Sequence, residues 1–316
     1  MTKFSFFCIF IYLLTSCQMK QSSSSVSSFS SDDTVAVQMQ RFPFPEIPVT
    51  LTDPEDRKAW LLTHYWTLFN FADTALVNNR DVTEQGFVNF VALLVDGSTS
   101  EQLIRESLTQ WCSRFMIETH ACKVLMQIAD DYLYNPNSPF YNEKLYSLYL
   151  EAVLDELPKE DVRCSTLNFK LKLLKRNNPG DKAMNFTYYL PDGTRCTLAA
   201  TPVKGDRLLL VFYDSECESC HAVLQQMSDD VTLAKEVKEG LISVLAIYTE
   251  GNDEVWRKAL PSMPKEWIIG TDHEAVKTGA LYDLKAMPSL YLLDGQKRVV
   301  LKDVSFEQLS TAIKRG

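Results

Sequence analysis

The sequence predicts an all-α domain followed by an α/β domain with a central mixed sheet flanked by helices. Three observations support this division. Between residues 53 and 178, apolar residues recur at the three- and four-residue spacing of amphipathic helices. After Asn178-Pro179-Gly180, short apolar runs bounded by turn residues alternate with helical patterns, which is typical of an α/β sheet. A length of 316 residues also suits two domains better than one.

The first predicted domain contains a series of apolar stripes at helical spacing. Breaks fall at Asp96-Gly97, at the proline-containing segment 135–139 and at Leu157-Pro158. The stripes cover residues 62–76, 87–94, 108–115, 122–133, 145–152 and 167–174. These stripes and breaks predict a bundle of about 125 residues made only of helices.

The second predicted domain begins with strands. The run 207–213 (RLLLVFY) is continuously apolar, as expected of a strand that is buried on both faces. Asp192-Gly193 and Asp294-Gly295 are hairpin turn signals. We expect strands at 184–190, 207–213, 241–248, 268–269, 289–293 and 298–301, and helices at 217–238, 252–260, 273–281 and 305–314.

The N-terminus carries a targeting signal. Lys3 precedes an apolar run at 4–14, which is too short to span a hydrocarbon core of about 30 Å. The run ends in Leu14-Thr15-Ser16-Cys17, which resembles a bacterial lipobox and implies lipidation of Cys17. The alternative is a plain secretory signal with an incidental cysteine.

Four segments follow from these patterns. Residues 1–17 are predicted to be a lipoprotein signal peptide, 18–45 a flexible Ser-rich tether, 46–178 the helical domain and 179–316 the α/β domain. The proline-stiffened stretch 41–48 (RFPFPEIP) is expected to pack along the helices. The protein would then be anchored in the cell envelope, facing the periplasm.

Charge and cysteine content narrow the possible functions. A net charge of −9 and the lack of a basic stripe argue against nucleic-acid binding. The histidines show no metal-ligand spacing. Of the eight cysteines, only Cys217 and Cys220 have a diagnostic spacing. The sequence leaves open whether Cys112 pairs with Cys122 and Cys164 with Cys196.

The motif Cys217-Glu218-Ser219-Cys220 directly follows the buried strand and opens a predicted helix. A helix N-terminus carries unpaired N–H groups and about half a positive charge, which favours a thiolate there. Cys217 is therefore the expected nucleophile. The spacing lets Cys220 reach back and resolve a mixed disulfide.

Pro288 lies just before the strand expected at 289–293, about 70 residues after the CxxC motif. With this proline the region 178–316 resembles the thioredoxin superfamily, nearest its TlpA/ResA-like branch. The resemblance implies a cis-proline at Pro288 and a substrate groove in which Met287 offers backbone groups. It implies no metal or organic cofactor, and it implies protein thiol or disulfide substrates and a partner protein that recycles the cysteines.

A second resemblance lies in the helical region. Residues 132–149 (YLYNPNSPFYNEKLYSLY) are similar to an α-helical domain of unknown function that precedes thioredoxin-like domains in some bacterial lipoproteins. This likeness implies an architecture and no activity.

The sequence departs from the thioredoxin pattern around the cysteines. Val211 stands where thioredoxin has a buried acid, and Glu216 stands in place of a tryptophan. Glu216 and Glu218 are expected to oppose a thiolate at Cys217, while a protonated His221 would offset them. Glu218 and His221 are thus the candidates for tuning the cysteine pKa values.

The predicted function is dithiol–disulfide exchange, and three alternatives stay open. Residues 217–221 also match the CxxCH pattern of c-type haem attachment. A peroxiredoxin would need a threonine and a proline before its cysteine, and Asp214-Ser215-Glu216 offers neither. A binding or scaffold lipoprotein would use Cys217–Cys220 as a structural disulfide. The substrate, the direction of exchange, the role of the helical domain and the oligomeric state are not determined by the sequence.

Overall fold

The structure is a computed structural model that describes residues 41–315. The predicted signal peptide, Cys17 and most of the tether lie outside the described residues. Residues 41–315 belong to one unit in which the two regions described below make direct contacts. No helix in this range is long and apolar enough to cross a bilayer.

The region before the sheet is helical, as the stripes predict. Its elements are α1 (Pro54–His64), α2 (Thr74–Asn78), α3 (Arg80–Leu94), α4 (Glu101–Phe115), α5 (Thr119–Ala129), the π-turn η1 (Asp130–Tyr134), α6 (Glu143–Glu156) and α7 (Arg163–Leu174). The stripe at 62–76 is divided between the end of α1, a turn and α2, with the Asp73 carboxylate capping α2. The prediction of one continuous helix over residues 62–76 was therefore wrong.

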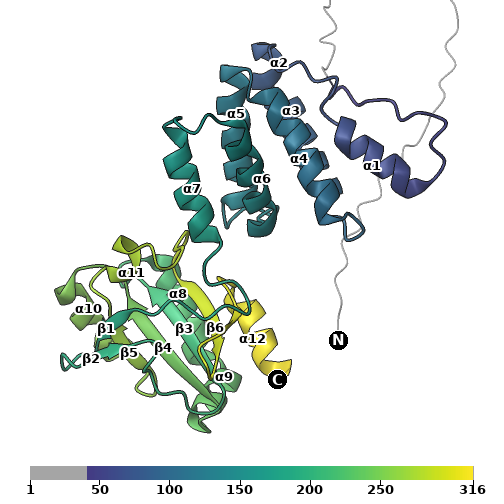
Figure 1. Cartoon of the computed structure of the whole chain (residues 1–316). Helices are drawn as coiled ribbons and strands as arrows, with labels where there is room; N and C mark the ends of the chain where they lie inside the picture. Colours follow the sequence, from purple (N-terminus) through teal and green to yellow (C-terminus); the bar gives the residue numbers. More distant parts are fainter. Residues whose placement is uncertain (1–40, 316) are drawn as a thin grey trace, which may run out of the picture. The chain divides into compact units, whose positions relative to one another are not determined.

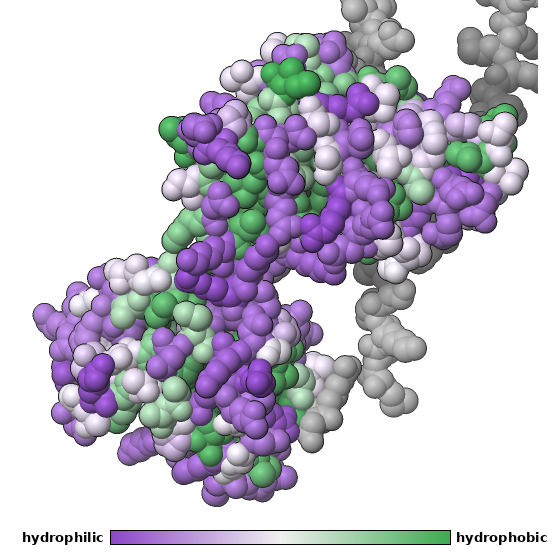
Figure 2. Space-filling view, viewed as in Figure 1, coloured by the Kyte–Doolittle hydropathy of each residue, from purple (hydrophilic) through white to green (hydrophobic). Residues whose placement is uncertain are grey.

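The helices share one aromatic core. Trp111 of α4 is completely buried and lies 4.9 Å from Phe115 and 5.4 Å from Phe87, measured between ring centroids. Hydrophilic residues cover most of the visible face of this region (Figure 2). The burial of the apolar stripe of each helix holds the bundle together.

The proline-rich segment 41–48 packs on the helices, as expected. The ring of Phe42 is buried against Tyr65, Trp66 and Phe69. Gly86 of α3 makes room for it, because a Cβ at Gly86 would lie 2.2 Å from the Phe42 ring.

A mixed sheet with strand order β2-β1-β5-β4-β3-β6-β7 forms the second region (Figure 1). Its strands are β1 (Thr187–Tyr189), β2 (Arg195–Thr197), β3 (Arg207–Tyr213), β4 (Ile242–Tyr248), β5 (Ile268–Thr271), β6 (Ser289–Asp294) and β7 (Val299–Leu301). β3 pairs in parallel with β4 and antiparallel with β6, so it lies inside the sheet.

Helices cover the sheet. They are α8 (Glu218–Asp229), α9 (Val231–Lys238), α10 (Asp253–Ala259), the 3-10 turn η2 (Leu260–Ser262), α11 (Ala275–Thr278) and α12 (Phe306–Arg315). Alternate residues of β3 belong to two different cores: Leu209 and Val211 to one, Leu208 and Leu210 to the other. The prediction of a strand buried on both faces is confirmed.

Two predicted helices differ from the structure. The helix expected at 217–238 is interrupted at Asp230, which has an extended backbone and caps α9 by accepting a hydrogen bond from Leu233 N–H at 2.8 Å. The helix expected at 273–281 is reduced to the four residues of α11. His273, Glu274 and Ala280 all have positive φ, which ends helical geometry on both sides.

Candidate active site

The two cysteines of the motif lie where β3 passes into α8. Cys217 is the N-cap of α8, with φ −88° and ψ 120°, and Glu218 is the first helical residue. Asp214 shapes the short loop, because its carboxylate accepts from Glu216 N–H at 2.9 Å and its carbonyl accepts from Cys217 N–H at 3.4 Å. The backbone N–H groups of Ser219 and Cys220, in the first turn of α8, interact with the Cys217 sulfur.

The two thiols differ in exposure and in acidity. Cys217 is half-buried and Cys220 is completely buried. The Ser219 hydroxyl, with help from backbone N–H groups, holds the pKa of Cys217 below its usual value. Burial raises the pKa of Cys220 to about 12. Cys217 is thus the readily ionised and accessible thiol of the pair.

Ser219 connects Cys217 to a distant part of the chain. Its Oγ lies 2.9 Å from Cys217 Sγ and donates to the carbonyl oxygen of Met287 at 2.8 Å. Cys217 Sγ itself lies 3.8 Å from that same carbonyl oxygen. Sequence reasoning missed Ser219, although a hydroxyl between two cysteines was a signal that could have identified it.

The carbonyl oxygen of Met287 lies close to Cys217 and Ser219. The Met287–Pro288 peptide bond is cis. Pro288 is followed directly by β6, whose Ser289 pairs with Phe212 near the end of β3. The loop that contains Met287 and the loop that contains Cys217 therefore meet at the same edge of the sheet.

The two predicted tuning residues do not contact the Cys217 sulfur. Glu218 is exposed. His221 Nε2 donates to the carbonyl oxygen of Ser215 at 2.7 Å, and the ring borders a cavity of about 310 Å³ shared with Met263. Glu216 and Glu218 were expected to oppose a thiolate at Cys217, but the pKa of Cys217 is lowered, with the hydrogen bond from Ser219 as the main cause.

The haem alternative would require His221 as an iron ligand. In the hydrogen bond to the Ser215 carbonyl, Nε2 carries a proton, so Nδ1 is the ring nitrogen that could offer a lone pair. Within residues 41–315, no group of three or more His, Cys, Asp or Glu side chains is placed to hold a metal ion.

The remaining described cysteines are free thiols, as are Cys217 and Cys220. Cys122 packs between the sulfurs of Met116 and Met126, at 3.5 and 3.6 Å. Cys112 is completely buried, which raises the pKa of its thiol. The two pairings that the sequence left open, Cys112–Cys122 and Cys164–Cys196, are absent from the structure.

Solved structures with a similar fold include a thioredoxin-like protein. A thioredoxin-like protein from Bacteroides caccae is 33% identical, with a TM-score of 0.74 over 88% of this chain and 99% of that chain. The chain is a member of this thioredoxin-like family. The extent of the match means that it includes most of the helical region as well as the sheet.

Other matches cover parts of this thioredoxin-like protein. The model of a family described as a domain of unknown function, DUF5106, matches residues 15–177, just over half of the chain, so the helical region belongs to that family. A conserved protein of unknown function from Bacteroides fragilis is 37% identical over 43% of this chain and 98% of that chain, with a TM-score of 0.41. No curated protein matches.

Proposed function

We propose that the protein is a thiol–disulfide oxidoreductase that exchanges electrons with protein substrates through Cys217 and Cys220. The observation that carries this proposal is the asymmetry of the two thiols. Cys217 is half-exposed with a lowered pKa, and Cys220 is buried with a raised pKa. Cys217 is suited to attack a substrate disulfide, and Cys220 is suited to the later intramolecular step that resolves the mixed disulfide.

In the first step the Cys217 thiolate attacks one sulfur of a substrate disulfide. A new S–S bond forms between Cys217 and the substrate while the substrate's own S–S bond breaks. The departing sulfur leaves as a thiolate with the electron pair of that bond and takes a proton from water. When Cys217 is a thiolate, the single Ser219 hydroxyl proton would turn from the Met287 carbonyl to Cys217 Sγ and stabilise the attacking sulfur.

In the second step Cys220 loses its proton and attacks Cys217 Sγ. The mixed disulfide breaks, the second substrate thiol is released, and Cys217 and Cys220 become linked. Two electrons have passed from the dithiol to the substrate. A partner dithiol returns the pair to its reduced form, and the same steps in reverse would oxidise a substrate.

The loop of Met287 and Pro288 is the proposed groove for substrate chains. The Met287 carbonyl faces the active cysteine, with 3.8 Å between its oxygen and Cys217 Sγ. An extended segment of substrate that pairs with the Met287 backbone would hold its disulfide within reach of Cys217. The proposed substrates are therefore proteins. We further propose that the protein acts in the cell envelope, anchored there by a lipid on Cys17.

The experiment is turnover of insulin disulfides by the full chain, with a small dithiol as the recycling reductant. We expect wild-type turnover to exceed the uncatalysed rate and Cys217→Ser to abolish the difference. Cys196→Ser removes another half-buried thiol from the sheet region and should retain wild-type turnover. Equal rates with and without the wild-type protein would refute the proposal.

A further inference from the structure

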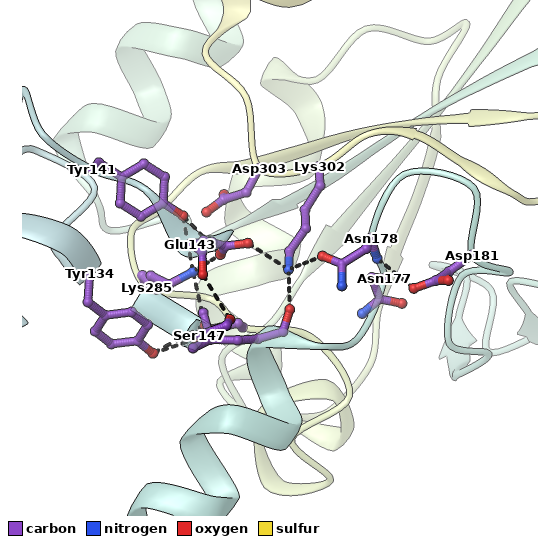
Figure 3. A network of polar contacts seen from close by, with 12 residues as sticks. Tyr134, Tyr141, Glu143, Ser147, Asn177, Asn178, Asp181, Lys285, Lys302 and Asp303 are labelled. Atoms are coloured by element: carbon purple, nitrogen blue, oxygen red, sulfur yellow. Dashed lines mark hydrogen bonds and ion pairs between the residues drawn. The ribbon is translucent and has the colours of Figure 1, made fainter. Parts of the chain in front are cut away.

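A cluster of charged side chains joins the start of α6 to the segments that flank β6 and β7 (Figure 3). Glu143, the first residue of α6, forms an ion pair with Lys285 and another with Lys302 at 2.8 Å. Lys285 Nζ also lies 2.9 Å from Asp283 Oδ2. Glu143 comes from the helical region, whereas both lysines and Asp283 come from the sheet region.

These charges are shielded from water. The side chains of Lys285, Lys302, Asp283 and Glu143 are 4%, 5%, 7% and 18% exposed. Burial works to raise the pKa of Glu143, but the two lysines outweigh it and hold that pKa below its usual value. A buried ion pair of this kind depends strongly on each partner, since removing one leaves an uncompensated charge.

Hydroxyl groups of the helical region complete the cluster. Tyr141 donates to Glu143 at 2.9 Å and accepts from Lys285 at 3.2 Å. Tyr134 donates to both oxygens of Asp283 at 3.1 Å. Lys285 is thus surrounded mainly by groups that belong to the helical region.

Lys285 lies two residues before Met287, in a stretch 281–288 that contains no helix or strand. The conformation of such a stretch depends on its side-chain contacts. Further on, Ser289 donates to Asp303 at 2.6 Å, and Asp303 follows Lys302 in the chain. The loop of Met287 and Pro288 is therefore held on one side by Lys285, which belongs to the cluster. On the other side it is held by the bond from Ser289 to Asp303, which is next to Lys302 of the cluster.

The loss of Glu143 would affect the two lysines differently. Lys302 would keep the carbonyl of Leu174 at 3.0 Å and the Asn178 side chain at 3.1 Å. Among the described residues, the ion pair that Lys285 would keep is the one with Asp283, which belongs to its own loop. The end of the loop nearest Met287 would then lose its ionic connection to α6.

We propose that Glu143 is a positioning residue: through its ion pair with Lys285, the helical region holds the loop of Met287 and Pro288 where protein substrates bind. This inference rests on the function proposed above and gives the helical region a role in that reaction. Glu143 acts through Lys285 and the loop, and it does not touch the reacting sulfurs.

The test measures kcat and KM for insulin reduction by the full chain. Glu143→Gln keeps the shape of the side chain and removes its charge. Because the loop then binds substrate less well while Cys217 and Cys220 are unchanged, we expect KM to rise about threefold or more and kcat to stay within about twofold. Lys285→Met, which removes the other charge and keeps the aliphatic stem, should have the same effect.

The double variant Glu143→Gln/Lys285→Met separates positioning from general damage. If both residues act through one contact, its KM should not exceed that of the more affected single variant. Circular dichroism of each variant checks the helix content, and Lys285→Met decides the question if Glu143→Gln does not fold.

Glu151→Gln is the matched control. Glu151 lies on the same helix and pairs with Arg105 at 2.6 Å and with Lys175, all within the helical region. We expect it to leave KM unchanged. Wild-type turnover with the same KM in Glu143→Gln, Lys285→Met and Glu151→Gln would overturn this inference alone, as would KM effects that multiply in the double variant. A lack of wild-type turnover would instead overturn the proposed function.

Discussion

At the scale of single residues, the Ser219 hydroxyl is the main cause of the lowered pKa of Cys217. Its hydroxyl lies within hydrogen-bonding distance of both the Cys217 sulfur and the Met287 carbonyl. A hydrogen bond to the charged form of a group lowers the pKa of an acid. The identity of the residue before the second cysteine therefore influences how readily Cys217 forms a thiolate.

We predict that Ser219→Ala raises the pKa of Cys217, because the thiolate loses the hydrogen bond that favours it most. The rate of alkylation by iodoacetamide follows the thiolate fraction, so its midpoint should move to higher pH. Near neutral pH the rate should fall roughly three- to tenfold, as expected for a hydrogen bond to a charged group worth about 1 kcal/mol or more.

Glu218→Gln provides the comparison for this pH profile. Glu218 is the exposed neighbour of Ser219 and makes no contact with the Cys217 sulfur in the described structure. Its profile should stay close to that of the wild type. A larger shift in Glu218→Gln than in Ser219→Ala would show that the charge of the acid outweighs the hydrogen bond.

The sequence allowed the cysteines and Pro288 to be found, since their signals are local spacing and position relative to a strand. The sequence analysis did not assign a role to Ser219, although its contact with Cys217 is local; its second contact, with the Met287 carbonyl 68 residues away, could not be predicted. The sequence also did not predict the cluster of charged residues around Lys285. Its partners are 142 residues apart in the chain and come together only in the folded protein.

At the scale of secondary structure, α8, which begins after Cys217, and α9 are separated by Asp230. Its carboxylate accepts from Leu233 N–H at 2.8 Å and so satisfies one of the free N–H groups at the start of α9. The apolar pattern continues across this point, which is why the sequence predicted one helix where the structure has two.

We predict that Asp230→Ala destabilises α9 locally. The loss of an N-cap costs about 1 kcal/mol, so amide hydrogen exchange in α9 should accelerate about fivefold when followed by mass spectrometry. Asp229→Ala, at the exposed end of α8, is the matched control and should leave exchange in α9 unchanged. Equal exchange in both variants would mean that α9 does not depend on this cap.

Buried strands have a clearer signature in this sequence than the short helices do. β3 and β4 were predicted closely because a continuous apolar run has few other interpretations. The segment 273–281 was not predicted closely, since His273, Glu274 and Ala280 have positive φ values, a conformation that such residues usually avoid.

At the scale of the whole molecule, the change of pattern near Pro179 correctly separated helices from sheet. The contacts between these two regions could not be predicted. They depend on buried pairs such as Glu143–Lys285 and on Arg176, whose guanidinium donates to the carbonyl of Ala280. Neither kind of contact has a signature in the local sequence.

The lipid anchor is a prediction about the protein in its cell. Cys17→Ala removes the proposed lipidation site, so the protein should be recovered in soluble or unprocessed form and should lose the metabolic label of a lipid precursor. The measurement is cell fractionation with labelling of wild type and variant. A Cys17→Ala protein that is processed normally and stays in the membrane would contradict this prediction.

The central claim is that Cys217 attacks substrate disulfides and Cys220 resolves the product. Capture of the intermediate tests it most directly: the full-length Cys220→Ser variant is mixed with a protein disulfide and analysed by non-reducing electrophoresis and mass spectrometry. Because the second step needs the Cys220 thiol, we predict a stable mixed disulfide between Cys217 and a substrate cysteine, absent from the Cys217→Ser/Cys220→Ser double variant. A captured disulfide at another cysteine, or none at all, would contradict the account.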